Sequence, residues 1–170
     1  LAQPAANLEL DARSRTLLAL ETIKAQVRPL LELLPSLSPA ELAQQLYPRP
    51  EDYGKVFEQI DLAWLSKQYA QLWSGGIELK LAADQRVLEI HAAPAGMLRD
   101  ENELSFHFPG GYRKAADYLN PHRIWVAWKY LRPGASAGMA FDGLVWVDDH
   151  WAWFPKPYRL IGQWLTKTQQ

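Results

Sequence analysis

Cysteine is absent from this 170-residue chain. Its absence excludes disulfide bonds, thiolate metal sites and cysteine nucleophiles, and it is compatible with any compartment. Long apolar runs are missing as well. The longest, residues 30–34, is far below the roughly 20 residues that a membrane-spanning helix needs, so no transmembrane segment is expected.

An excess of charge of one sign is also lacking. The net charge at pH 7 is −1, which leaves no basic surplus to hold a phosphate backbone, and we expect no nucleic-acid binding. Serine is sparse, and none of the serines lies in a nucleophile-elbow pattern, so no Ser–His–Asp set can be placed. The sequence therefore predicts neither a catalytic nucleophile nor a cofactor.

The first residues bear on the compartment. Residues 1–7, Leu-Ala-Gln-Pro-Ala-Ala-Asn, are similar to the small, polar stretch that follows a cleaved export signal. A shortened N-terminus would look the same. We expect a periplasmic or secreted protein, and a cytoplasmic location stays open as the alternative.

Helices are predicted for the first half of the chain. Apolar residues recur every three or four positions from about residue 11 to 27, and Pro29 is expected to break or kink this helix. Residues 38–41, Ser-Pro-Ala-Glu, form a capping-box pattern that starts a short second helix. The longest helix is expected over residues 51–73, ended by the Gly-Gly pair that follows at 75–76.

Strands are predicted for the second half, because the apolar period changes from 3.6 to 2 after residue 76. The alternation predicts a hairpin over 77–91, a third strand over 104–108 and a meander over 123–154. Short helices are expected over 112–119 and 158–165.

The last meander suggests how the sheet is built. Residues 123–131 are apolar on both faces, which is typical of a central, covered strand, and tight turns make its neighbours antiparallel. We therefore expect a single α+β domain over 1–170, with a helical lead-in (1–48) and an α+β core (50–165). In it the N-terminal helices pack on a curved antiparallel sheet of about six strands.

The closing segment resembles a known superfamily. Residues 143–159, Gly-Leu-Val-Trp-Val-Asp-Asp-His-Trp-Ala-Trp-Phe-Pro-Lys-Pro-Tyr-Arg, look like the last hairpin of many NTF2-like (cystatin-like) proteins. The order of elements over residues 50–160 is similar too, whereas the lead-in of 1–48 is long for that superfamily. The resemblance implies a sheet that curls around the long helix and leaves a cavity. Members include enzymes, ligand binders and protein-binding modules.

Three polar residues are candidates for a catalytic or ligand site. His91 and His107 lie on the polar sides of their expected strands, and if those strands pair, the two rings share one face. Such a pair suits acid–base or metal chemistry, although no third ligand lies at metal-motif spacing, so no metal site is predicted. Asp142 precedes Gly143 inside a strand, which indicates a β-bulge that aims the carboxylate into a pocket. The simpler interpretation of both histidines is a solvent-facing position.

Tryptophan is the abundant residue, with eight in the chain. Trp151 and Trp153 share one face of the last hairpin by alternation. If that face is exposed, they form an aromatic platform, with a rigid rim of Lys156, Tyr158 and Arg159; if it is the inner face, the rings belong to the core.

Two further motifs have structural explanations. Asp148 and Asp149 are expected to form a turn, where aspartate bonds its own backbone, rather than a cation site. Residues 108–114, Phe-Pro-Gly-Gly-Tyr-Arg-Lys, place glycines ahead of a helix, where backbone N–H groups can hold an anion, but they match no phosphate-loop pattern.

Two functions follow as hypotheses. The first is a non-enzymatic module that holds a protein partner on the tryptophan-bearing surface, as an accessory subunit or an immunity-type inhibitor would. The second is a small-molecule site in an apolar cavity, with or without hydratase or isomerase chemistry, in which His91, His107 and Asp142 supply the polar groups. Carbohydrate binding on the platform is a third, weaker alternative. A pocket lined by the three polar residues would favour the second hypothesis.

Overall fold

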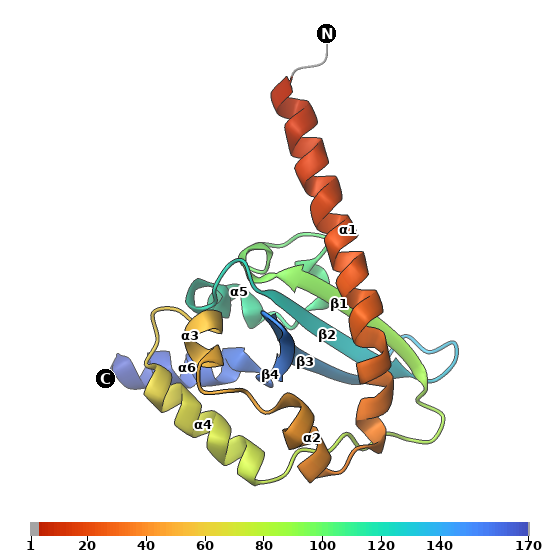
Figure 1. Ribbon diagram of the computed structural model, residues 1–170, viewed down its shortest axis with the longest axis vertical. Coiled ribbons are helices and arrows are strands. Elements are labelled where there is room, and N and C mark those ends of the chain that lie inside the picture. Colours follow the sequence, from red (N-terminus) through yellow and green to blue (C-terminus); the bar gives the residue numbers. More distant parts are fainter. Residues whose placement is uncertain (1–3, 170) are drawn as a thin grey trace.

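The computed structural model describes residues 4–169 and shows an α+β fold, in which helices pack on an open antiparallel sheet (Figure 1). Of the stretch 1–7, on which the export expectation rests, the first three residues lie outside this range. No helix in the described part of the chain combines the length and the apolar character needed to span a membrane.

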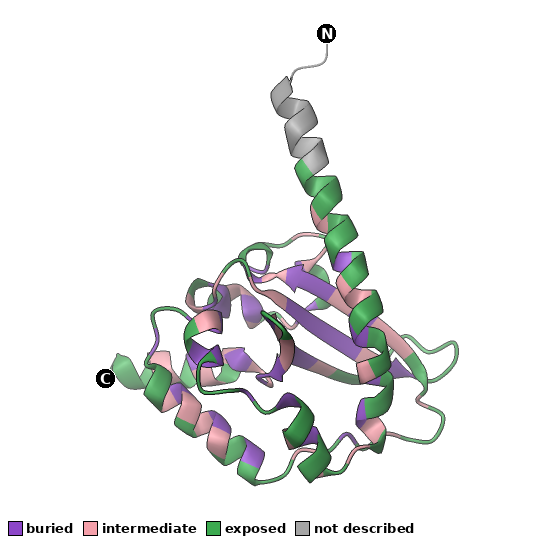
Figure 2. Cartoon of the chain, in the orientation of Figure 1, coloured by how far each residue is buried: buried purple, intermediate pink, exposed green. Residues whose placement is uncertain are grey.

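A long first helix, α1 (Pro4–Leu33), crosses the sheet and projects beyond it (Figure 1). The expected break at Pro29 does not occur. Proline cannot donate to the carbonyl four residues earlier, but Val27 and Leu31 on either side of it are fully buried, and Tyr130 Oη donates to the Leu31 carbonyl. Burial against the sheet therefore offsets the lost bond, while most of residues 12–19 of the helix are exposed (Figure 2).

The next helices are short. After a 3₁₀ turn (Leu34–Ser36), α2 (Pro39–Leu46) follows Ser38, its N-cap, with the predicted capping box. In it the side chains of Ser38 and Glu41 each accept a hydrogen bond from the other residue's backbone N–H. The expected long helix over 51–73 is wrong, because it is divided into α3 (Asp52–Val56) and α4 (Leu62–Ser74). Gln59 between them has φ 58°, and the Asp61 side chain caps the second helix.

The sheet has four strands in the order β1-β2-β3-β4, all antiparallel, rather than about six. They are β1 (Val87–Pro94), β2 (Ile124–Leu131), β3 (Gly138–Val147) and β4 (His150–Trp153). β2 is central, as predicted. Its alternate residues meet different elements, since Tyr130 contacts α1 on one face while Trp125 packs on Phe57 and Tyr112 on the other.

Two predicted strands are absent from the described chain. Residues 77–82 run irregularly without a ladder partner, although Leu79 is buried. Residues 104–108 contain instead a 3₁₀ turn (Ser105–His107), because the Asn102 side chain accepts the N–H groups of Leu104 and Ser105. The alternation there reflected a turn in which Phe108 is buried and Phe106 is 79% exposed.

The remaining elements frame the sheet. Turns 95–97 and 116–118 are 3₁₀, α5 (Tyr112–Ala115) is a single turn, and α6 (Pro157–Thr168) is the expected closing helix, a few residues longer than predicted. Asp148 and Asp149 form the predicted tight turn between β3 and β4.

Candidate functional site

A cleft lies over one face of β1, β2 and β3, beside the 105–109 segment. Its volume is about 380 Å³. All three candidate polar residues line it. The full lining is His91, Phe106, His107, Phe108, Pro109, Ala127, Trp128, Lys129, Ala140, Phe141 and Asp142.

The floor of the cleft follows from strand register. His91 pairs with Ala127, and Ala127 pairs with Asp142, so the three side chains lie in one row across the sheet. Ala127 is the short member in the middle, and its small side chain leaves room between the histidine and the carboxylate. The predicted bulge is confirmed at Gly143, which has φ 96° and is the extra residue that lets Asp142 face Ala127.

Asp142 is the acid that lines the cleft. It is only 6% exposed, and its Oδ1 accepts a hydrogen bond of 2.7 Å from the buried Tyr112 hydroxyl. Burial raises the pKa of Asp142, although the Tyr112 bond and the charges of Lys156 and Arg159 act in the opposite direction. A buried carboxyl with a raised pKa in a cleft is a common mark of a functional site.

His91 and His107 come together as the sequence suggested, by a different route. His91 lies on β1, but His107 lies on the 3₁₀ turn and not on a paired strand. Their rings stack with centroids 3.8 Å apart and planes 4° apart. His91 Nε2 is 2.6 Å from Glu89 Oε1, a bond that lowers the Glu89 pKa; burial, helped by the neighbouring His91, lowers the His107 pKa.

The two tryptophans expected to form an aromatic platform differ in burial. Trp153 is 2% exposed and donates its indole N–H to the Asp142 carbonyl at 2.8 Å, so it belongs to the core. Trp151 is half-buried, with its ring 5.2 Å from that of Trp146. The structure therefore places one of the two rings where no partner can stack on it.

The residues expected to form the rim, Lys156, Tyr158 and Arg159, lie near Asp142. Tyr158 packs on Tyr112 with centroids 5.3 Å apart, and Lys156 takes a left-handed conformation with φ 48°. Arg159 is exposed, and its charge acts on Asp142. These rim residues are not among those that line the cleft.

The Asp148–Asp149 turn and the glycine motif of residues 108–114 both have structural roles. Asp148 accepts bonds of 2.8 Å from Lys55 and Arg123, which lower its pKa to about 2. In the glycine motif, a Cβ at Gly111 would lie 2.6 Å from the Tyr158 ring, so glycine is needed for close packing there.

Sequence reasoning missed several residues of the site. Glu89 was detectable, because it lies two positions before His91 and so on the same face of a strand. Tyr112, Ala127 and Lys129 gave no local signal. Their roles depend on register and on how α5 packs, which spacing does not reveal.

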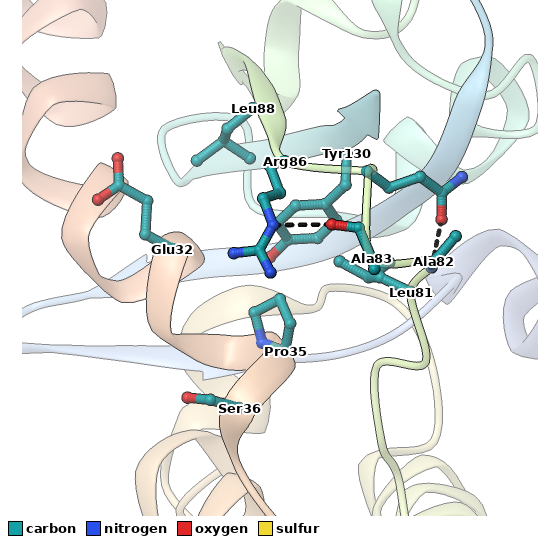
Figure 3. Close-up of a pocket in the computed structure, with 10 residues that line it drawn as sticks. Glu32, Pro35, Ser36, Leu81, Ala82, Ala83, Arg86, Leu88 and Tyr130 are labelled. Carbon is teal, nitrogen blue, oxygen red and sulfur yellow. Dashed lines mark hydrogen bonds between the residues drawn. The ribbon is translucent and has the colours of Figure 1, made fainter. Parts of the chain in front are cut away.

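A larger hollow of about 460 Å³ lies at the end of α1, beside Tyr130 (Figure 3). Its polar groups are already engaged: Arg86 Nε donates to the Ala83 carbonyl at 2.7 Å, and the Gln85 side chain accepts from Ala82 N at 2.9 Å. The Tyr130 hydroxyl is bonded to Leu31. This hollow contains none of the three polar candidates His91, His107 and Asp142, all of which line the smaller cleft.

Comparison with models of protein families, with curated proteins and with solved structures gives no match. The interpretation of the site consequently depends on its own geometry.

Asp142→Asn is expected to stabilise the folded chain at neutral pH. Because burial raises the Asp142 pKa, folding favours the protonated form; that contribution is complete below pH 3.8, the ordinary value, and is lost as the pH rises through the raised pKa. The variant should melt a few degrees higher than the wild type at pH 7 and at the same temperature near pH 3.5. Thermal melts followed by circular dichroism between pH 3.5 and 8 test this.

Asp100→Asn, at an exposed position, is the matched control and should melt at the wild-type temperature at pH 7. An Asp142→Asn variant that is less stable than the wild type across the whole pH range would contradict the expectation.

Proposed function

We propose that the chain binds a small organic molecule with a flat ring in the cleft over β1–β3, and that Asp142 exchanges a hydrogen bond or a proton with it. The observation that carries the proposal is the row His91–Ala127–Asp142. It places the His91 imidazole and the buried Asp142 carboxyl on either side of the short Ala127 side chain, beneath a cavity of about 380 Å³.

The lining suits a ring. Phe108 is buried, Phe106 is largely exposed at the edge, and Pro109 and Ala140 add further apolar surface. Small-molecule sites typically combine such apolar walls with a few convergent polar groups, and the volume lies within their range of about 300–1,000 Å³.

Asp142 is the group suited to chemistry. A buried carboxyl with a raised pKa is a stronger base, once ionised, than an exposed one, and this favours proton transfer to or from a bound ligand. The NTF2-like resemblance agrees with this proposal, because the resemblance implies a cavity beside a curved sheet. An NTF2-like relationship is itself part of the proposal.

A protein-binding role has less support. It relied on an exposed pair, Trp151 and Trp153, and the burial of Trp153 leaves only Trp151 to contribute to such a surface. The cleft, by contrast, gathers all three polar residues that the second hypothesis named.

Ala127→Leu tests the proposal by filling the cleft without removing a polar group. Ligand-observed saturation-transfer NMR with a mixture of phenols, benzoates and indoles should show binding to the wild type. Ala127 is 5% exposed between His91 and Asp142, so the leucine should abolish that binding. Ala63→Leu, on an exposed face of α4, is the matched control and should bind as the wild type does.

Asp142→Asn is the second variant, since it keeps the volume of the side chain and the fold. It should lower the affinity for any fragment that contacts the carboxyl by about tenfold, which corresponds to roughly 1.4 kcal/mol of binding free energy. Absence of binding to the wild type at millimolar fragment, or equal binding by Ala127→Leu, contradicts the proposal.

A further inference from the structure

Three groups that ligate metals come together on β1 and the 3₁₀ turn, two of them in the lining of the cleft and the third beside it. Glu89 and His91 are two residues apart on β1, so their side chains point to the same face. His107 reaches them from the 3₁₀ turn. One ligand atom from each residue, a carboxylate oxygen and two ring nitrogens, lies within 4.8 Å of the others.

The turn that carries His107 is held in place. Asn102 Oδ1 accepts the N–H groups of Leu104 and Ser105 at 2.9 Å, and Ser105 Oγ donates to the Asp100 carbonyl at 2.6 Å. Ser105 is 4% exposed. His107 is therefore presented by a fixed backbone, while its own ring is exposed to solvent.

The distances suit one ion. Zn²⁺ binds imidazole nitrogen and carboxylate oxygen at about 2.0–2.2 Å, which places two ligand atoms of a tetrahedral site about 3.4 Å apart. His91 Nε2 and Glu89 Oε1 are 2.6 Å apart in a hydrogen bond, so an ion entering there replaces the shared proton and separates the two atoms. The stacked rings, 3.8 Å apart at their centroids, then need only tilt toward the ion.

The donor set selects the kind of metal. Two imidazoles and one carboxylate suit first-row transition ions such as Zn²⁺, whereas Mg²⁺ and Ca²⁺ take oxygen ligands. Three protein ligands leave one or more positions for water or a substrate atom. His91 and His107 also line the cleft, so those positions lie next to the proposed ligand space.

One neighbouring charge opposes the ion. Lys129 is the cross-strand partner of Glu89 and also lines the cleft, and its positive charge repels a cation at short range. This makes Lys129 a useful control, because its removal should strengthen a real metal site and leave unrelated surface binding unchanged.

We propose that Glu89, His91 and His107 form a site for a divalent first-row transition-metal ion, with open coordination positions toward the cleft. The site stands on the geometry of these three residues alone. It does not depend on the proposed function, since the ion can bind whether or not an organic ligand does.

Isothermal titration of the tag-free chain, residues 1–170, with Zn²⁺ alone tests the site. The expected result is one ion per chain with micromolar or tighter affinity. His91→Ala, His107→Ala and Glu89→Ala should each weaken binding by at least about tenfold, as loss of a direct ligand exceeds the 10–100-fold effect typical of groups that only support ligands. Lys129→Met should tighten binding.

Matched controls exist for each ligand type. His122→Ala and Glu78→Ala remove exposed residues that lie outside the cluster, and both should bind as the wild type does. In ¹⁵N side-chain spectra, Zn²⁺ should shift the ring signals of His91 and His107 and leave His122 unmoved. This readout does not depend on any activity.

The results separate the two proposals. The metal site is overturned if the wild type does not bind Zn²⁺, or if His91→Ala and His107→Ala bind it as tightly as the wild type does. It is also overturned if His122→Ala loses as much affinity as those two variants. Because Ala127→Leu leaves all three ligands in place, it should keep Zn²⁺ binding while losing aromatic fragments. A fragment result of either sign therefore leaves the metal test unaffected.

Discussion

Gly143→Ala is expected to destabilise the folded chain by about 3 kcal/mol, because a side chain there combines strain with a clash. Gly143 has φ 96°, and a Cβ would lie 2.0 Å from the Phe154 carbonyl oxygen. That backbone cannot move away easily. Phe154 N donates to the Gly143 carbonyl at 2.8 Å, and the Phe154 ring is fully buried against Tyr53 and Phe57.

Gly134→Ala is the matched control. Gly134 also has a left-handed conformation, with φ 76°, but a Cβ there has nothing within 4 Å. It should therefore cost only the conformational strain, about 1 kcal/mol. Urea unfolding of both variants separates the two effects, and equal losses would show that the contact with Phe154 does not matter.

The same glycine links stability to the cleft. The bulge makes Asp142, rather than its neighbour, face Ala127 and His91. If alanine forces the bulge out of register, the carboxyl leaves the floor row. Gly143→Ala should then lose fragment binding as well as stability, whereas Gly134→Ala should keep it.

The bulge also shows what local sequence reasoning can achieve. An aspartate followed by glycine inside an alternating strand predicts a bulge from neighbouring residues alone. The Ser38 capping box and the last meander were likewise predictable from short stretches of sequence. Each depends on residues close together in the chain, where backbone chemistry alone decides the outcome.

The errors have two different causes. Pro29 was expected to break or kink the first helix, but the helix continues past it, since burial of Leu31 against the sheet outweighed the lost hydrogen bond. The alternation around Phe106 looked like a strand, yet the Asn102 side chain wound it into a turn. At Pro29 a tertiary contact overrode the local pattern, as packing commonly does, whereas at Phe106 a local bond from the Asn102 side chain to the backbone decided the turn.

The site divides in the same way. His91, His107 and Asp142 were selected by residue type and strand position, and the structure brings all three to one cleft. Tyr112 was treated only as a helix residue, although its hydroxyl is the direct partner of Asp142. Nothing in the sequence indicates a contact between residues thirty positions apart on different elements.

A second contact of this kind gives the other large expected effect. Asp52 is fully buried, and its Oδ2 lies 2.8 Å from His150 Nε2 and accepts the Arg49 N–H at 2.8 Å. Asp52 Oδ1 has no hydrogen-bond partner among the described residues. His150 Nδ1 in turn lies 2.7 Å from the exposed Asp149. The pair joins α3 to β4.

His150→Ala should therefore destabilise the chain by roughly 3 kcal/mol, because the fully buried Asp52 carboxylate loses the imidazole and keeps just the Arg49 N–H among its described partners. His122→Ala, at an exposed position, should change stability by less than about 0.5 kcal/mol. Urea unfolding at pH 7 measures both.

The cause of the loss can be isolated with a second substitution. Asp52→Asn in the His150→Ala background removes the unpaired charge but keeps an acceptor for the Arg49 N–H. It should recover part of the lost stability, since a buried neutral amide costs less than a buried ion. If His150→Ala costs no more than His122→Ala, or if Asp52→Asn deepens the loss in that background, the burial of an unpaired carboxylate is not what the histidine prevents.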